Sequence, residues 1–478
     1  MAAIAPTRGA HPRALTSLFF TEMWERFSYY GMRALLVLYL VKAAGYSRAD
    51  ALALYATYTG LVYLSPVLGG YVSDRYLGYR KAILAGGLII MLGHFAMAVP
   101  SMLHFALGLI VIGTGLFKPN ITTFLGTFYG EQDPRRDGGF TIFYMGINLG
   151  AFMAPLVAGT LGQTVGWDWG FASAGVGMAF GLLQFWLGRA RLGTAGFPPG
   201  QSALTGRDGL HILAIAGGAI AFLAAMFAVW PALAPLWAGV PLVARVLVPL
   251  ALIGWLLRDV QRHEGGVATQ RVLAILVLCA FVIAFWTGFE QAGGTMSLFA
   301  DHQTDRHLFG WEIPAAWFQS VNPLTILLLA PVFSWFWNRL DTSRFALSTP
   351  AKMAVGMIIL GLGFALLYVA QQRADLLGVV GPQWLVGVYV LHTMGELCLS
   401  PIGLSMVTKL APVRLAALLM GVWFIANGVA GYLAGILESL LTNSGLPLFA
   451  VLMGSSIGAG LLLLLLTPIL KGWMHGRG

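Results

Sequence analysis

Long apolar segments alternate with short polar ones along the whole chain, and this pattern predicts an α-helical protein that crosses a membrane many times. An α-helix needs about 20 predominantly apolar residues to span the hydrocarbon core of a bilayer. The segments are continuous, unlike the alternating stretches of about ten residues that form outer-membrane barrels. The fourteen predicted spans cover residues 16–44, 50–73, 81–100, 103–126, 140–163, 169–188, 209–230, 240–257, 271–299, 313–337, 351–371, 383–410, 414–440 and 446–470.

The spans fall into two groups of six with two extra spans between them. A linker with several glycine and proline residues covers 189–208, and such residues punctuate helices. The two spans that follow it contain a single charged side chain, Arg245, and differ in this from the others. We therefore predict a six-helix bundle over 1–190, a linker with two extra transmembrane helices over 191–265, and a second six-helix bundle over 266–478.

The composition agrees with a membrane protein. Of the 478 residues, 58% are apolar and 10% are charged, whereas a soluble domain has about 45–50% apolar and about 25% charged residues. The mean hydropathy is +0.78. These values exclude a disordered chain and an ordinary soluble enzyme.

The net charge of +9 would suggest nucleic-acid binding in a soluble protein, but here its distribution indicates topology. With a cytoplasmic N-terminus, 20 of the 28 Lys and Arg residues fall in cytoplasmic segments, four in outer loops and four within spans. Cytoplasmic loops of membrane proteins carry such an excess of basic residues. This distribution predicts an inner (plasma) membrane protein with both termini cytoplasmic. A monomer is expected, and no nucleic-acid partner.

Charged residues inside the spans point to a functional site, because each costs roughly 2.5–3.5 kcal/mol at mid-membrane on insertion scales. A cap at the cytoplasmic interface would explain two of them structurally, Glu22 and Arg26, but it would not explain Arg33. The seven residues are Glu22, Glu25, Arg26, Arg33, Lys118, Glu290 and Glu396.

The first span carries a polar stripe, which predicts that one of its faces borders a hydrated cavity. At 100° per residue, the members of the stripe fall within an arc of about 140°. The stripe consists of Glu22, Glu25, Arg26, Tyr29, Tyr30 and Arg33.

Depth along the helices suggests partners for these charges. At 1.5 Å per residue, Glu22 and Lys118 lie at a similar level in the inner half, and Arg33 and Glu290 lie at a similar level in the outer half. The seven intramembrane charges comprise four acids and three bases. One bound proton would balance them, so the proton is the predicted coupling ion, with no other cofactor.

Three sequence blocks resemble signatures of the proton-dependent oligopeptide transporter family, a branch of the major facilitator superfamily. Residues 22–31 (EMWERFSYYG) resemble its ExxERFxYYG motif, and residues 69–78 (GGYVSDRYLG) and 140–150 (FTIFYMGINLG) resemble its helix 2–3 and helix 5 signatures. The resemblance implies the major facilitator fold, with two six-helix bundles. Twelve spans plus a linker hairpin is also the arrangement of the bacterial members.

The resemblance also implies functional residues. For proton coupling it implies Glu22, Glu25, Arg26, Lys118, Arg33 and Glu290. For substrate binding it implies Arg26, Tyr29, Tyr30, Arg33, Tyr63, Lys118, Tyr144, Asn148, Trp286, Glu290, Asn322, Glu396, Ser400 and Trp423. The chain lacks the helix 2 histidine of animal members, which leaves the carboxylates as the candidates for coupling. The well-placed histidine of the C-terminal half, His392, is interpreted as a packed helix residue.

The implied function is proton-coupled symport of di- and tripeptides into the cytoplasm. A free peptide is a zwitterion, so Arg26 and Lys118 suit its carboxylate, Glu396 suits its ammonium group, and aromatic side chains tolerate varied substituents. Another small organic or anionic substrate is the alternative, although an anion carrier has no use for Glu396.

Two other classes of membrane protein fit the sequence less well. An embedded protease would need HExxH or two central aspartates, which the spans lack, so we expect no enzyme. A sensor without transport is disfavoured by the presence of a coupling motif. The charged residues near 301–312 are predicted to form an ordinary solvated loop.

Overall fold

The structure is a computed structural model that describes residues 10–130, 133–197, 205–238, 242–308, 310–344, 346–442 and 444–476. The described part of the chain is helical almost throughout and contains an antiparallel pair of short strands, β1 (His307–Leu308) and β2 (Trp311–Glu312). The helices are α1 (Arg13–Lys42), α2 (Arg48–Val72), α3 (Gly78–Met97), α4 (Leu103–Gly126), α5 (Arg136–Thr160), α6 (Trp167–Leu187), α7 (Gly206–Ala238), α8 (Leu242–His263), α9 (Gly265–Phe289), α10 (Thr295–His302), α11 (Val321–Asp341), α12 (Thr349–Leu377), α13 (Pro382–Leu410), α14 (Ala416–Leu441) and α15 (Leu448–Met474).

Helix boundaries follow local sequence signals. The Ser47 hydroxyl caps α2 by accepting a hydrogen bond from the Asp50 N–H at 3.1 Å, which satisfies one of the free donors of the first turn. Pro350 and Pro382 lie in the first turns of α12 and α13, where proline removes no helical hydrogen bond. Gly78, with a φ of 69°, ends the π-helical turn that follows α2, and glycine adopts this conformation without strain.

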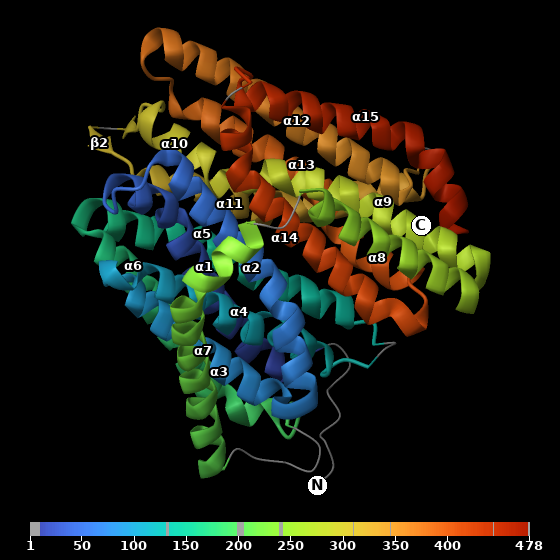
Figure 1. The fold of residues 1–478 in the computed structure, drawn as a ribbon, viewed down its shortest axis with the longest axis horizontal. Coiled ribbons are helices and arrows are strands. Elements are labelled where there is room, and N and C mark those ends of the chain that lie inside the picture. Colours follow the sequence, from blue (N-terminus) through green and yellow to red (C-terminus); the bar gives the residue numbers. More distant parts are fainter. Residues whose placement is uncertain are drawn as a thin grey trace.

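The long helices pack into two halves (Figure 1). In the first half, α1 packs against α5 and α6, and α3 packs against α4 and α6. In the second half, α12 packs against α13 and α15, and α9 packs against α14 and α15. The candidate charged residues of the sequence lie on the inner helices of these halves, so the arrangement brings residues far apart in the chain together.

Glycines permit the closest helix crossings of the first half. A Cβ atom at Gly69 of α2 would collide with the backbone of Gly115 of α4, and one at Gly150 of α5 would collide with the Met23 carbonyl oxygen of α1. Because α1 carries the polar stripe, a larger side chain at Gly150 would displace the charged residues from their positions.

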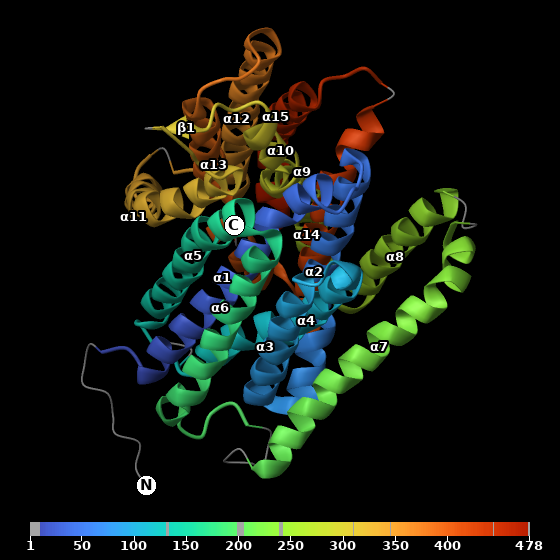
Figure 2. The same cartoon turned by 90° about the vertical axis from the view of Figure 1, so that its left-hand side faces the viewer.

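The linker helices α7 and α8 lie to one side of the two halves (Figure 2). α7 packs against α3 and α4, and Lys81 of α3 forms an ion pair with Asp208 near the start of α7 at 2.5 Å. α8 packs against α9, and its Asp259 forms an ion pair with Arg414, which precedes α14, at 2.5 Å. Each linker helix is therefore attached to a different half.

Ten helical stretches among the described residues are long and apolar enough to cross a membrane, judged by length and composition. This count treats the stretch from α2 to α3 as one of 50 residues. It leaves out α1, because this helix carries more charged residues than the count allows in a span. The predicted all-helical membrane fold is confirmed, and the number of fourteen spans stays a prediction.

The predicted span 271–299 is not one continuous helix. α9 ends at Phe289, a 3₁₀ turn covers Glu290–Gly293, and α10 begins at Thr295. Two consecutive glycines, Gly293 and Gly294, end the turn, and glycine is unfavourable within a helix. Glu290 consequently lies at the break, where its side chain and the surrounding backbone face the other half of the molecule.

Polar contacts between the halves gather at the end where α1, α5, α10 and α14 finish, which we call the closed end. Among the described residues, such contacts extend from this end to the level of Glu290. The contacts nearest to it are Lys42–Asp301 (2.7 Å), Arg48–Glu438 (2.6 Å), the Trp317 indole to Thr160 (2.9 Å), the Ala316 N–H to Gln163 (3.0 Å) and the Ser320 hydroxyl to the Phe152 carbonyl (2.8 Å).

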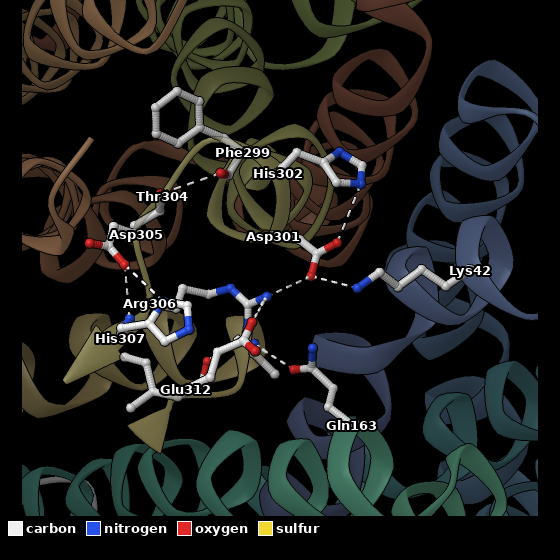
Figure 3. Close-up of polar contacts among 12 residues, drawn as sticks. Lys42, Gln163, Phe299, Asp301, His302, Thr304, Asp305, Arg306, His307 and Glu312 are labelled. Atoms are coloured by element: carbon white, nitrogen blue, oxygen red, sulfur yellow. Dashed lines mark hydrogen bonds and ion pairs between the residues drawn. The ribbon is translucent and has the colours of Figure 1, made fainter. Parts of the chain in front are cut away.

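The prediction of an ordinary solvated loop near 301–312 is wrong for Asp301. Its side chain is only 1% exposed and belongs to α10. Figure 3 shows Lys42 reaching it from the first half, while Arg306 (3.4 Å) and His302 (3.3 Å) approach it from its own half. Asp301 is close in sequence to the turn at Glu290, and for this reason it becomes part of the contact between the halves.

Candidate functional site

A cavity with an empty space of about 840 Å³, including its opening, lies between the two halves. Its lining comes from α1, α2 and α5 of the first half, and from α9, α11 and α13 of the second, with the turns that join them. Nine of the predicted substrate-binding residues line it: Tyr30, Arg33, Tyr63, Tyr144, Asn148, Trp286, Glu290, Asn322 and Glu396.

An ion pair joins the two halves at the closed end of this cavity. The Arg33 Nη2 atom lies 2.6 Å from Glu290 Oε2, and the two side chains are 9% and 6% exposed. The pairing predicted from depth along the helices is thus confirmed. Its burial matters because removing one partner of such a pair leaves an uncompensated charge.

Two tyrosines of α2 form hydrogen bonds with this ion pair, one with each of its members. The Arg33 Nε atom donates to the Tyr55 hydroxyl at 2.7 Å, and the Tyr63 hydroxyl donates to Glu290 Oε1 at 3.3 Å. A Cβ atom at Gly293 would collide with the Tyr55 hydroxyl and meet Arg33 Nε at 3.0 Å. Glycine at the helix break therefore leaves room for the pair.

The predicted meeting of Glu22 with Lys118 is not present in the structure. Arg26 takes the place of the lysine, with its Nε atom 2.7 Å from Glu22 and 3.3 Å from Glu25. Lys118 is partly buried and its ammonium group lies 4.9 Å from the centre of the Tyr63 ring. A spacing of four residues gave Glu22 a local partner on the same helix face, and this local contact replaces the predicted one.

The cluster on α1 contains more carboxylate than it can neutralise locally. Glu22 and Glu25 are fully buried and share the guanidinium group of Arg26. Glu25 receives no hydrogen bond from the described residues on either oxygen. A buried charge without such bonds is unfavourable, so binding of a proton at this cluster would relieve the imbalance.

Glu396 of α13 is a second glutamate, besides Glu290, that lines the cavity. Its Oε2 atom accepts a hydrogen bond at 2.9 Å from the amide of Asn322, which also donates to Thr393 at 2.9 Å. His392 lies one turn earlier, lines the cavity and packs its ring 4.5 Å from that of Phe364. The interpretation of His392 as a packed helix residue agrees with this contact.

The remaining predicted residues are placed elsewhere. Tyr29 is buried against Tyr30, and Trp423 is buried in α14. The side chain of Ser400 lies outside those that the structure describes. Of the predicted residues with described side chains, the following do not line the cavity: Glu22, Glu25, Arg26, Tyr29, Lys118 and Trp423.

The structure adds residues that the sequence reasoning did not select. Tyr55 contacts Arg33, and Gln319 and Tyr389 line the cavity. Gln319 lies one helical turn before Asn322, so its spacing to a selected residue was the available signal. The described residues contain no group of three or more His, Cys, Asp or Glu side chains that could hold a metal ion.

Comparisons with known proteins agree on one family. A family model described as POT family matches residues 80–217 and 250–450. The chain is 37% identical to the peptide transporter YePEPT of Yersinia enterocolitica over 98% of its length and 96% of that protein. It is 35% identical to a di-/tripeptide transporter of Lactococcus lactis subsp. cremoris, with 96% of each chain covered.

A solved structure is similar over the whole chain. A mutant of a peptide transporter, crystallised in complex with alafosfalin, superimposes with a TM-score of 0.81 at 36% identity. The match covers 98% of this chain and 97% of that one.

Proposed function

The chain belongs to the POT family of transporters, and from this premise we propose that it carries di- and tripeptides into the cytoplasm together with protons, by alternating access. It is a multi-pass membrane transporter and not an enzyme. The single observation that best supports the proposal is the cavity between the halves, which is closed at one end by a buried ion pair between them.

The charges around the cavity suit the two ends of a peptide. We assign the ammonium group to Glu396, whose second carboxylate oxygen receives no hydrogen bond from the described residues. We assign the carboxylate to the cationic region of Arg26 and Lys118. Neither lines the cavity in this arrangement, but Lys118 contacts the ring of Tyr63, which does.

Apolar and aromatic groups lie between these charged regions. Tyr144 and Trp286 line the cavity, and aromatic rings provide contact area without requiring one substituent shape. This suits a carrier whose substrates share a backbone but differ in side chains.

Proton coupling is assigned to the α1 cluster and to the ion pair at the closed end. Protonation of Glu22 or Glu25 would neutralise a buried excess of negative charge next to the carboxylate region. Protonation of Glu290 would remove one charge of the pair that joins the halves. The second event changes an interaction that joins the halves, and a difference in interactions between the open and closed states is the requirement for coupling. The first event changes the charge beside the region assigned to the substrate carboxylate.

We further propose fourteen membrane spans in a monomer, with bundles over 1–190 and 266–478 and a linker over 191–265. The separate attachment of α7 and α8 supports this division. The distribution of basic residues supports an inner (plasma) membrane with both termini cytoplasmic.

Uptake of labelled dialanine into proteoliposomes tests the function. An inward proton gradient should drive accumulation above equilibrium, and a protonophore should abolish it. Equal uptake with and without the gradient would contradict proton coupling. Accumulation of nitrate, without uptake of dialanine, would favour the anionic alternative.

A further inference from the structure

Two amide side chains, Gln319 and Asn322, lie one helical turn apart on the wall that the second half contributes to the cavity. The inference drawn from them concerns substrate recognition and rests on the proposed function. An amide can present either its oxygen or its NH₂ group to a ligand, and these recognise opposite partners. The surrounding hydrogen bonds decide which group faces the cavity.

The orientation of Gln319 is fixed by Ser297 of α10. The Ser297 hydroxyl donates its single proton to the Ala292 carbonyl at 2.9 Å. Its contact with Gln319 at 2.8 Å must therefore use a hydroxyl lone pair, so the partner atom is the Nε2 donor of the amide. With Nε2 held in this way, Oε1 is left as the acceptor of a side chain that lines the cavity.

Asn322 is also oriented by a hydroxyl group whose proton is already donated to a backbone carbonyl. The Thr393 hydroxyl donates to the Tyr389 carbonyl at 2.7 Å and can only accept from Asn322, whose Nδ2 atom lies 2.9 Å away. Nδ2 also donates to Glu396. Neither amide oxygen receives a hydrogen bond from the described residues, so this wall presents acceptors to the cavity.

An acceptor wall selects a ligand with N–H donors. Besides its ammonium group, a peptide has one further backbone donor next to its N-terminus, the N–H of the first peptide bond. Glu396 is hydrogen-bonded to Asn322, and Gln319 lies one helical turn before Asn322. When the ammonium group of a peptide binds Glu396, the first peptide N–H can therefore reach the acceptor oxygen of Gln319. We propose that Gln319 Oε1 accepts a hydrogen bond from the first peptide N–H, and that Ser297 is the positioning residue that keeps the amide in this orientation.

The proposal predicts discrimination between an amide and an ester of the same shape. Alanyl-lactate replaces the peptide N–H of dialanine with an oxygen atom, which would face Gln319 Oε1 without a donor. Because a neutral hydrogen bond contributes about 0.5–1.5 kcal/mol, the protein should bind dialanine about two- to tenfold more tightly than alanyl-lactate. Affinities are measured by calorimetry on the purified protein, and uptake of both ligands is measured in proteoliposomes.

Variants of Gln319 and Ser297 assign this discrimination to the proposed atoms. Gln319→Met has a similar length without an acceptor, so its preference for dialanine should fall to near unity. Ser297→Ala should lower the preference because the amide is free to turn, whereas Ser297→Thr keeps the hydroxyl and should retain it. Gln303→Met is the matched control outside the cavity and should behave as the parent protein.

Two outcomes would overturn the proposal: a parent protein that does not distinguish the two ligands, or a Gln319→Met variant that retains the parental preference. If Gln319→Met cannot be purified, equal preferences in Ser297→Ala and Ser297→Thr would overturn it as well. Failure of the proposed function has a different signature, because the parent protein would then neither bind nor take up dialanine.

Discussion

Replacement of Glu290 by glutamine should shift the protein toward the conformation in which the two halves separate at the closed end. The carboxylate lies 2.6 Å from Arg33, and both side chains are nearly inaccessible. Glutamine keeps the shape and an acceptor oxygen but removes the negative charge. Arg33 would then remain buried with only neutral partners, including the Tyr55 hydroxyl.

The size of this shift follows from two opposing contributions. Removing one partner of a buried ion pair costs about 3–5 kcal/mol. The remaining hydrogen bond from Arg33 to the glutamine oxygen restores about 1.5–3 kcal/mol, as is usual for bonds to charged groups. Taking the middle of each range, the net bias is about 2 kcal/mol, which changes the ratio of the two states by about 30-fold.

Distances between spin labels at Ala43 and Thr442 would measure the populations, because these exposed residues follow α1 and α14 at the closed end. In Glu290→Gln, longer distances should gain population relative to the parent protein at the same pH.

The control is Asp341→Asn, which removes an exposed carboxylate paired with Lys352 of the same half. It should leave the distances unchanged. Identical distance distributions in Glu290→Gln and the parent protein would refute the role of the ion pair in opening.

Three further predictions follow from the charged groups. Glu22→Gln and Glu25→Gln should each abolish proton-driven accumulation while counterflow survives, and accumulation that persists in both variants would remove the coupling role. Glu396→Gln should lose the preference for free over N-acetylated peptides, and an unchanged preference in competition assays would contradict the ammonium assignment. In the loop before α5, the side-chain and backbone hydrogen bonds of Arg135 lower the pKa of Asp133 to about 2. Its contribution to stability is therefore complete above the unfolded-state pKa near 4 and is lost as the pH falls toward 2. A carbon-13 titration should show the low pKa in the parent protein and a higher one, still below that of the unfolded state, in Arg135→Gln, because the backbone N–H of residue 135 still donates to Asp133.

The charged residues of the site could be predicted from the sequence, because a charge inside the membrane is energetically unfavourable without a partner. An arginine or glutamate inside an apolar span needs a partner, and depth along the helices was sufficient to match Arg33 with Glu290. The same estimate paired Glu22 with Lys118 and was wrong, since depth says nothing about the direction in which a side chain points. The i, i+4 spacing of Glu22 and Arg26 provided a nearer partner.

Other features depend on contacts that no single segment encodes. Tyr55 resembles any aromatic residue of a membrane helix until the fold places it against Arg33. The acceptor orientation of Gln319 depends on Ser297, which belongs to a helix that begins after an unexpected break at Glu290. The burial of Asp301 arises from the same break, which turned a predicted loop into a helix facing the first half.

The contacts at the closed end also limit how far the thermal stability of this protein can rise without loss of transport. A carrier turns over only if neither of its end states is a thermodynamic trap, so the bonds that join Lys42 to Asp301 and Arg48 to Glu438 have to break in every cycle. Substitutions that strengthen this end would raise the melting temperature of the purified protein and slow its turnover. Thermostability screens on such a transporter would therefore select variants held in one conformation. These variants would crystallise well and transport poorly.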